Sequence, residues 1–497
     1  MGIRVWKVHM DIDKKGIHLF TLLATVAELH PDKTFFSFND RQYSYQQVLS
    51  SAQCCAHAFA RLGVEKGQRV ILQCGNNPFF IFSFFGIMQL GATAILVNPA
   101  ARIHELSYYY ITGEATMIIT DGTLATRYSS LEEKFPGATF ITLAHTPGFE
   151  SIETILDGEK ELNIWNETRL DEPAVIIFTS AMDGYALGAT LSHNNLTRSA
   201  AIASSLFNDN GGKFVAVLPL FHAFGLTTSL VMPLLNTREI ILIPRFSPKK
   251  LITVLARPDT GFITAVPAIY SILKNILSPG TDYSHITVWV SGGDFLPVSL
   301  QQWFQDACRI IIRQGYGLTE ASPIVTWNIP DQDPRPGSIG RAMPYNQVKI
   351  VNNGLESQQG QTGELLVKGL NVTRGYYNNP AKTSQFIQDG WLHTGDTGYM
   401  DSDGYFFLTG RKKDMILKNG FNVYPAEVQR ILSMKPGIKD VRISGHLEIT
   451  EDATSIESLH ATIFAPGNSS ITEEDIRKWC IENISSYKIP DTLEITR

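Results

Sequence analysis

Short runs of apolar residues alternate with longer stretches of helical periodicity through the first two thirds of the chain. Short continuous apolar runs are typical of buried strands, and strands that alternate with helices predict a mainly parallel sheet covered by helices. In such sheets, ligands bind beyond the carboxyl ends of the strands. The clearest expected strands are residues 69–73, 117–120, 174–178, 214–218, 240–243 and 288–290.

A long apolar stretch at residues 78–97 has about the length of a membrane span. We interpret it as a core helix, a turn at Gly91-Ala92 and a buried strand over 93–97, because glycine between apolar segments punctuates a buried α/β unit. We therefore expect no membrane span. The first residues lack the apolar core and cleavage site of a secretory signal, so we expect a cytoplasmic protein.

The composition of the chain changes after about residue 330, where turn-forming residues become frequent in segments such as GQTGELLVKG, RGYYNNP and DSDGYFFLTG. Short strands with tight turns are typical of a β-rich unit. The predicted fold class is α/β. We expect a large N-terminal domain of mainly parallel sheets over residues 1–412, with a β-rich subdomain at about 330–410, and a small α+β C-terminal domain over 413–497.

Composition narrows the functional classes. The chain has 497 residues, of which 18% are charged, and a formal net charge of −6. This balance argues against a nucleic-acid-binding protein, which would carry a basic face, and the 44% of hydrophobic residues excludes global disorder. Five cysteines without a CxxC pair favour reduced thiols over disulfides or a zinc site.

The loop after the expected strand at 174–178 is rich in hydroxyl and glycine residues and reads TSAMDGYALG from Thr179 to Gly188. Loops of this kind bind phosphate through backbone N–H groups, and Ser192 is placed to cap the helix that follows. The loop has no lysine and no dense run of glycines. An ordinary connecting loop is therefore the alternative interpretation.

Three further segments carry side chains suited to a nucleotide. In GYGLTE, Tyr316 can stack on a base and Glu320 can hold Mg²⁺ through a hard oxygen ligand. In GWLHTGDTG, Asp396 can accept both ribose hydroxyls, and in GRKKDMILKNGFNVYPAEV, Arg411 is a second candidate for ribose contact. Gly420 permits a ligand to approach the backbone closely. For each segment alone, an ordinary turn is the alternative.

In their order and spacing, these segments resemble the adenylate-forming (ANL) superfamily of acyl-CoA synthetases, luciferases and peptide-synthetase adenylation domains. The similarity includes SGGD at 291–294 and LPLFHAFG at 218–225, and it runs from about residue 17 to the end. The segments LPLFHAFG, KGLNVTRGYYNNP and NGFNVYPAEV are most similar to acyl-CoA synthetases. The resemblance implies a small C-terminal lid that rotates between two half-reactions. First a carboxylate attacks the α-phosphate of ATP to give acyl-adenylate, and then the CoA thiol attacks to give the thioester and AMP.

The resemblance also implies roles for residues that match the family's motifs. The catalytic candidates are His222, Thr319, Glu320 and Lys413, although a satisfied core histidine and a solvated surface charge are the alternatives for His222 and Lys413. The implied contacts are adenine at Gly293, Asp294 and Tyr316; ribose at Asp396 and Arg411; phosphate at Thr179, Ser180 and Thr319; Mg²⁺ at Glu320; the CoA channel at His222 and Gly420; and the acyl pocket at Val266, Gly292 and Gly315.

The phosphate loop departs from the family pattern, which reads roughly TSGTTGxPKG. The first glycine is Ala181, two hydroxyl-bearing residues are Met182 and Asp183, and the lysine is Leu187. Two unit charges about 4 Å apart interact by roughly 4 kcal/mol at an effective dielectric near 20, so losing a cation and gaining an acid weakens triphosphate binding. The alternative is a mobile loop in which these changes matter little.

A second departure lies at the C-terminus, where family members continue past a segment like YKIP at 487–490 to a P-x-T-x-x-G-K-type motif. Its lysine stabilises charge that develops during adenylation. The present sequence stops at Arg497, before that motif is complete, so we expect a shortened lid. Both departures affect adenylation, whereas the residues assigned to AMP binding and thiolation are retained.

The sequence therefore predicts an acid–thiol ligase that forms an acyl thioester from acyl-adenylate and CoA, with adenylation by ATP impaired or lost. A partner adenylating enzyme would then supply the activated acid. Three alternatives stay open: an ordinary ATP-dependent acyl-CoA synthetase, a non-catalytic protein that binds AMP or acyl-CoA, and a relative with an amine or carrier-protein acceptor. The apolar pocket candidates favour a fatty or aryl acid, and neither the chain length of the acid nor the oligomeric state follows from the sequence.

Overall fold

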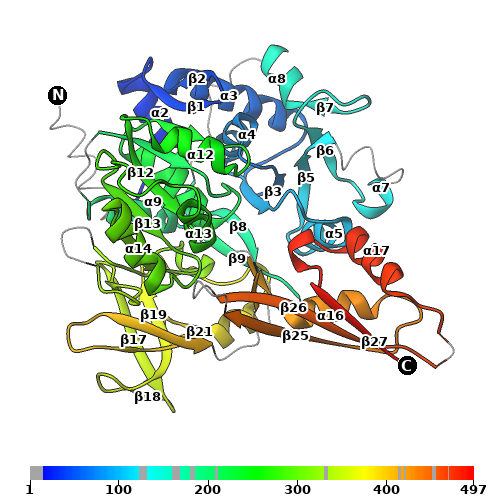
Figure 1. Ribbon diagram of the computed structural model, residues 1–497. Coiled ribbons are helices and arrows are strands. Elements are labelled where there is room, and N and C mark those ends of the chain that lie inside the picture. Colours follow the sequence, from blue (N-terminus) through cyan, green and yellow to red (C-terminus); the bar gives the residue numbers. More distant parts are fainter. Residues whose placement is uncertain are drawn as a thin grey trace.

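Two large sheets with helices packed on their faces form most of the structure, and a smaller unit lies beside them (Figure 1). Alternating strands and helices build both sheets, as the apolar pattern predicts. The computed structural model describes residues 15–122, 131–158, 168–179, 185–207, 211–329, 334–411, 416–418, 421–449, 455–467 and 469–497.

The first sheet has seven strands in the order β7-β6-β5-β3-β4-β8-β9. All neighbours are parallel except β8 and β9, which form an antiparallel pair. The strands expected at 69–73, 117–120 and 174–178 are confirmed. The bounds are β3 (Arg69–Gln73), β4 (Thr93–Val97), β5 (Ala115–Thr120), β6 (Thr139–Thr142), β7 (Glu150–Ser151), β8 (Pro173–Thr179) and β9 (Leu187–Ser192).

The second sheet has nine strands in the order β16-β15-β14-β13-β12-β10-β11-β1-β2. Its central strands are parallel, and antiparallel pairs close both edges. The bounds are β1 (Thr34–Phe38), β2 (Arg41–Ser44), β10 (Lys213–Ala216), β11 (Ile240–Leu242), β12 (Thr260–Ala265), β13 (Val288–Ser291), β14 (Ile312–Tyr316), β15 (Thr326–Trp327) and β16 (Arg341–Ala342).

Alternate residues of the central strands face different cores, because successive side chains point to opposite faces of a sheet. Val70 and Phe214 join one large core between the two sheets, whereas Ile71 and Val215 face separate outer cores. Helices α2 (Leu19–Leu29), α3 (Tyr45–Arg61), α4 (Pro78–Gln89) and α9 (His193–Ser204) contribute to the middle core, α5 (Ile103–Thr112) to one outer core, and α12 (Pro248–Leu255), α13 (Pro267–Lys274) and α14 (Val298–Cys308) to the other.

Residues 78–97 form a helix, a turn and a strand, as predicted. Asn77 caps α4 by accepting a hydrogen bond from the Phe80 N–H, and Gly91 turns the chain with a φ of 65°. None of the helices in the described ranges is long and apolar enough to cross a bilayer. The shorter helices are α7 (Leu131–Lys134), α8 (Ile152–Gly158), α10 (Ala223–Leu226), the π-helix η1 (Thr227–Val231), α11 (Met232–Leu235) and the 3₁₀-helix η2 (Thr319–Ala321).

A third, antiparallel sheet follows the nine-stranded one, in the region of dense turn residues. Its strand order is β18-β17-β19-β21-β20, with β22 paired to β21. The bounds are β17 (Asn346–Asn352), β18 (Leu355–Glu356), β19 (Gly363–Gly369), α15 (Pro380–Phe386), β20 (Ile387–Gln388), β21 (Trp391–Met400) and β22 (Phe406–Arg411).

The described residues from 416 to 497, which we call the lid, form a small α+β unit with its own apolar core. Helices α16 and α17 pack against a three-stranded sheet, and a short hairpin precedes them. The bounds are β23 (Ile416–Lys418), β24 (Phe421–Val423), α16 (Pro425–Ser433), β25 (Asp440–Ile449), β26 (Ser455–Phe464), α17 (Glu473–Asn483), the 3₁₀-helix η3 (Ser486–Lys488) and β27 (Thr492–Thr496). Lys413, the predicted domain boundary, lies outside the described residues.

Two neighbouring histidines, His18 and His193, predict a loss of stability in mild acid. The rings of His18 and His193 lie 3.8 Å apart, and burial lowers the pKa of His18 to about 4 and that of His193 well below its usual value. The unfolded chain binds more protons between pH 6.5 and 4, so the stabilisation is complete above pH 6.5 and falls toward pH 4, by about 3 kcal/mol for His18. Urea unfolding of the H18Q variant should show a weaker pH dependence from pH 6.5 to 5 than the parent protein, and equal slopes would contradict the assignment.

Candidate nucleotide and acyl site

The predicted ribose residues meet a tyrosine at the end of a central strand. The Tyr316 hydroxyl at the end of β14 donates to Asp396 Oδ2 at 2.6 Å, and Arg411 Nε lies 3.0 Å from Asp396 Oδ1. Antiparallel pairing of β21 with β22 sets Asp396 opposite Arg411. Burial and the neighbouring Asp396 carboxylate raise the pKa of Tyr316 well above its usual value, so its hydroxyl stays protonated. The cluster therefore brings together a carboxylate, a guanidinium group and an aromatic ring.

Glu320 lies beside this cluster, on η2, and joins three segments of the chain. Its Oε1 accepts hydrogen bonds from Thr179 Oγ1 and from the Tyr376 hydroxyl, both at 3.0 Å, and its carbonyl accepts from the Thr373 N–H at 2.7 Å. Burial, with the charge of Glu320 adding to it, raises the pKa of Tyr376. Thr319 precedes Glu320 on the same short helix. The end of β8 and the loop at 373–376 are thus fixed against η2.

The residues around Glu320 fit a Mg²⁺ ion held mainly by substrate. Within the described ranges, no three His, Cys, Asp or Glu side chains are grouped to hold a metal ion. Mg²⁺ in phosphate-handling enzymes takes one or two carboxylates plus phosphate oxygens and water. A single carboxylate at Glu320 satisfies that requirement, and Mg²⁺ bound there would neutralise phosphate charge.

A cavity with an empty volume of about 620 Å³, including its open mouth, opens beside these residues. Its walls bring together six of the predicted site residues, which are His222, Gly292, Gly293, Gly315, Tyr316 and Thr319. Val266 lies next to this wall, with its Cγ1 3.5 Å from the position of a Cβ on Gly293. The rest of the lining is mostly apolar and was not predicted from the sequence, although Val290 lies in an expected strand. These residues include Phe224, Thr228, Phe262, Thr264, Val290 and Trp327.

His222 stands at the N-terminus of α10 and faces the cavity. Its Nδ1 accepts a weak hydrogen bond from the Phe224 N–H at 3.4 Å, and burial lowers its pKa, so the ring is neutral at pH 7. Gly225 permits this turn, because a Cβ there would lie 2.1 Å from the Pro219 carbonyl oxygen. A neutral imidazole on the wall between apolar residues can accept or donate a hydrogen bond without adding charge.

Asp294 follows the two glycines at the end of β13. Burial raises its pKa to about 6, although the Phe295 N–H donates to its Oδ1 at 2.6 Å and Arg411 lies near enough to favour its charged form. Gly292 is closely packed, because a Cβ there would lie 3.0 Å from Phe224 Cζ. The two glycines thus line the cavity, and Asp294 follows them directly in the chain.

Leu187, which we match to the family's lysine from the sequence, is buried at the start of β9. It is 7% exposed and packs in an apolar cluster with Ala189 and Tyr376. Its carbonyl accepts a hydrogen bond from Thr179 Oγ1 at 3.3 Å. The remaining predicted loop and lid residues, which are Ser180, Ala181, Met182, Asp183, Lys413 and Gly420, lie outside the described residues.

A substitution at Gly317 tests how tightly the site is built. A Cβ on Gly317 would lie 1.3 Å from the Pro323 carbonyl oxygen, so the backbone must move to accept even alanine. We expect G317A to lower the free energy of unfolding by about 3 kcal/mol, at the upper end of overpacking effects, and to weaken AMP binding by displacing Tyr316. Urea unfolding and calorimetric AMP titration measure the two effects. Gly467 provides a matched control, because it has open space around it and no positive φ that would strain alanine. G467A should change neither the free energy of unfolding nor the affinity for AMP.

Comparison with known proteins defines the class to which the chain belongs. The chain is similar to the long-chain-fatty-acid–CoA ligase of Bacillus subtilis (27% identity, 96% of this chain and 91% of the relative). It is also similar to the 2-succinylbenzoate–CoA ligase of Bacillus thuringiensis (28% identity, 93% and 92%). The chain belongs to the AMP-binding enzyme family, whose profile matches residues 23–377. It is an adenylate-forming enzyme of the acid–CoA ligase type.

Solved structures confirm the α/β fold with its C-terminal domain. The o-succinylbenzoate CoA synthetase of Bacillus subtilis, bound to a product analogue, superposes with a TM-score of 0.85 at 22% identity, over 96% of this chain and 94% of that one. An amide bond synthetase from Marinactinospora thermotolerans gives the same TM-score at 21% identity, over 96% and 95%.

Proposed function

We propose that this acid–CoA ligase forms acyl thioesters from acyl-adenylate and CoA, and that its own adenylation of acids by ATP is weak. The observation that carries the proposal is the contrast between the two ends of the nucleotide site. The nucleoside end has Tyr316, Asp396 and Arg411 in direct contact. At the phosphate end, Leu187 is buried in an apolar cluster where the family has a lysine.

The acid that we propose is fatty or aryl, because the cavity beside Tyr316 is lined mainly by apolar side chains. Such a surface gains free energy by taking apolar area out of water, about 25 cal/mol per Å². The two ligases to which the chain is similar are named for a long-chain fatty acid and for an aryl acid. In this proposal, a partner enzyme supplies the acyl-adenylate.

Titration of AMP and of Mg-ATP into the purified protein tests the proposal without knowledge of the acid. We expect AMP to bind, and Mg-ATP to bind no more tightly than AMP. Synthetic decanoyl- and benzoyl-adenylate mixed with CoA should then yield acyl-CoA, while the free acids with Mg-ATP and CoA yield acyl-CoA slowly. Rapid synthesis from the free acids would contradict the proposal.

An ordinary ATP-dependent ligase is the second candidate, and the surroundings of Glu320 favour it. Thr179 and Tyr376 hold the carboxylate in place, as a Mg²⁺-phosphate site requires. Release of pyrophosphate at an ordinary rate, with decanoate or benzoate and Mg-ATP, would establish this candidate in place of the first.

A further inference from the structure

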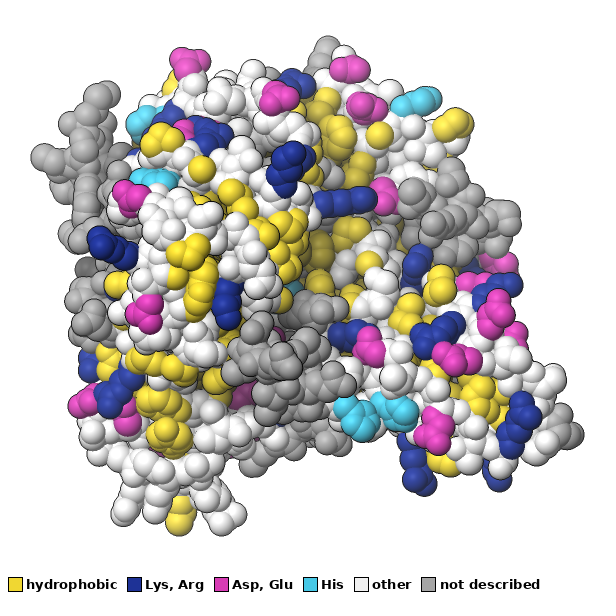
Figure 2. Space-filling view, viewed as in Figure 1, with side chains coloured by type: hydrophobic (Ala, Val, Ile, Leu, Met, Phe, Trp, Pro, Cys, Tyr) yellow, Lys and Arg dark blue, Asp and Glu magenta, His cyan; other side chains and the backbone are white. Residues whose placement is uncertain are grey.

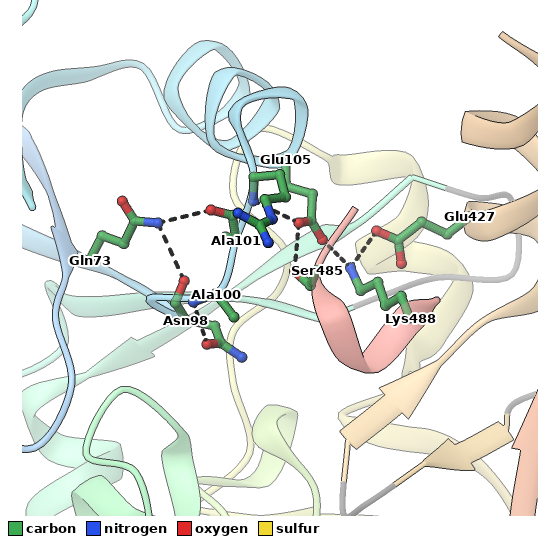
Figure 3. A network of polar contacts seen from close by, with 9 residues as sticks. Gln73, Asn98, Ala100, Ala101, Glu105, Glu427, Ser485 and Lys488 are labelled. Atoms are coloured by element: carbon green, nitrogen blue, oxygen red, sulfur yellow. Dashed lines mark hydrogen bonds and ion pairs between the residues drawn. The ribbon is translucent and has the colours of Figure 1, made fainter. Parts of the chain in front are cut away.

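A buried lysine of the lid is held between two carboxylates, one on each side of the domain interface (Figure 3). Lys488 Nζ lies 2.6 Å from Glu105 Oε1 and 2.7 Å from Glu427 Oε1. The side chains of Lys488 and Glu105 are only 1% and 3% exposed. Glu105 belongs to α5 in the N-terminal part, whereas Glu427 and Lys488 belong to the lid. One ammonium therefore joins the two parts of the molecule.

Glu105 is fixed firmly on its own side of the interface. Its Oε2 accepts the Arg102 N–H at 3.0 Å, which caps α5, and the lid's Ser485 hydroxyl at 2.6 Å. The turn before α5 is held in turn by Gln73 of β3, whose Nε2 donates to the Ala101 carbonyl at 3.1 Å (Figure 3). The lid thus docks two of its groups onto one carboxylate that the first sheet supports.

The same contacts determine where the lid meets the nucleotide site. Glu427 lies in the first turn of α16, three residues after Tyr424, which precedes that helix. Burial raises the pKa of Tyr424, the charges of Glu320 and Asp396 raise it further and the charge of Arg411 lowers it, so these groups of the nucleotide cluster act electrostatically on its hydroxyl. Fixing Glu427 against Lys488 and Glu105 therefore fixes Tyr424 beside the nucleotide cluster.

The segment that carries Lys488 also holds the hairpin at the start of the lid. Tyr487 stacks on Phe421 of β24 with ring centroids 4.5 Å apart. Lys418 of β23 pairs with Asp491 at 2.7 Å and donates to the Ile489 carbonyl at 2.6 Å. The residues on both sides of Lys488 thus hold β23 and β24 in place relative to the docked segment.

We propose that Glu105 and Lys488 are positioning residues. They latch the lid in the orientation that directs Tyr424 toward the nucleotide cluster, and they thereby support thioester formation. The proposal rests on the proposed function. A charged latch suits a lid that moves. When the lid moves away from α5, Lys488 retains its ion pair with Glu427, and water solvates the Glu105 carboxylate. An apolar contact of the same size would expose apolar surface whenever the lid opened.

The position of the lid can be measured without any activity. The five native cysteines are buried, so spin labels on I111C of α5 and I481C of α17, both at exposed positions, report the distance across the interface. We expect one narrow distance distribution in the parent protein and a broad or longer one in E105Q. The control R477Q removes an ion pair with Glu473 that lies within α17, and it should leave the distribution unchanged. An unchanged distribution in E105Q would overturn the latch.

Thioester formation from a synthetic acyl-adenylate and CoA provides the second measurement. We expect E105Q to lower kcat at least tenfold, S485A to lower it less, and both to bind AMP as the parent protein does, because the AMP candidates lie outside the latch. Glutamine at 105 can still accept the Arg102 N–H, so the fold should be kept, and K488R should retain most of the rate. A shifted distance with an unchanged rate would overturn the positioning role. A parent protein that makes no thioester would contradict the proposed function, and the label distances would then decide the latch alone.

Discussion

Replacing Asp396 with asparagine is expected to weaken AMP binding by about 10- to 100-fold. The Asp396 carboxylate accepts the Tyr316 hydroxyl at 2.6 Å and pairs with Arg411 at 3.0 Å, so it is fully oriented for a ribose diol. Hydrogen bonds to a charged group contribute about 1.5–3 kcal/mol each, and asparagine turns one acceptor into a donor that faces Arg411. A loss of about 1.4 kcal/mol corresponds to tenfold in affinity.

Calorimetric titration with AMP measures this loss, and D403N is a matched control. Asp403 also pairs with an arginine, Arg335, but at an exposed turn. Its replacement should leave the AMP affinity unchanged. If D396N bound AMP as tightly as the parent protein, the assignment of Asp396 to the ribose would be wrong.

The role of the Tyr316 ring can be separated from that of its hydroxyl. Y316F keeps the aromatic face but removes the hydroxyl that donates to Asp396. That hydroxyl competes with the ribose for the carboxylate, so its loss should leave the AMP affinity within about threefold of that of the parent protein. Y316A removes the stacking surface, which contributes about 1–3 kcal/mol per base in nucleic-acid complexes. Equal affinities in the two variants would show that the ring does not contact the base.

Much of the fold follows from the apolar pattern, and the ends of the strands show where that pattern fails. The run at 214–218 predicts a strand, but β10 ends at Ala216. The reason is Asn76, whose side-chain amide donates to the Leu218 carbonyl at 2.9 Å and to the Ile243 carbonyl at 3.2 Å, and whose oxygen accepts the Leu220 N–H. A side chain far away in sequence replaces the ladder partners, and no local pattern reveals it.

The candidate site likewise contains some residues that the sequence indicates and others that only the fold reveals. Tyr316, Glu320 and Asp396 stand in short glycine-bearing segments whose composition already indicates a nucleotide. Tyr376, which binds Glu320, and Lys488, which binds Glu105, carry no such local signal, because their partners lie 56 and 383 residues away along the chain. Contacts of that range follow only from the packing of the sheets and the lid.

The surface that the molecule presents around the lid also depends on the fold rather than on composition. Figure 2 shows Lys and Arg side chains interspersed with Asp and Glu over the lid on that face, without a large region of one sign. The net charge of −6 gives only the total over the chain and not how the charges are distributed on the surface. Charges that are mixed at close range are screened within about a Debye length, roughly 8 Å at physiological salt, and exert little long-range steering.

Restoring the family's phosphate loop is expected to raise the affinity for Mg-ATP by about a thousandfold. The variant combines A181G, M182T, D183T and L187K. Removal of one acid and addition of one base near a tetraanion change the interaction by several kcal/mol, since each pair at about 4 Å contributes roughly 4 kcal/mol at a dielectric near 20, and Mg²⁺ offsets part of it. At about 1.4 kcal/mol per tenfold, about a thousandfold remains.

Leu187 lies close to the candidate metal ligand, so we expect a lysine at this position to reach the phosphate charge. The Leu187 side chain packs against Tyr376, whose hydroxyl donates to Glu320 at 3.0 Å, so this side of the cluster borders the candidate metal ligand. A lysine stem can keep the apolar contacts while its ammonium extends toward Glu320 and the phosphates. The single variant D183T leaves this cluster intact and isolates the repulsion, for which we expect about tenfold or more of the total.

AMP has neither a β- nor a γ-phosphate, so its affinity should stay within about threefold in all of these variants, and the ratio of the two affinities isolates the phosphate end from the nucleoside end. L355K adds a lysine at an exposed position of β18 and controls for the one positive charge that L187K introduces. If the parent protein already bound Mg-ATP far more tightly than AMP, or if the restored loop changed nothing, then Asp183 and Leu187 would not limit triphosphate binding. The ordinary ATP-dependent ligase would then follow from the same titrations, because Glu320 and its partners would suffice to hold Mg-ATP.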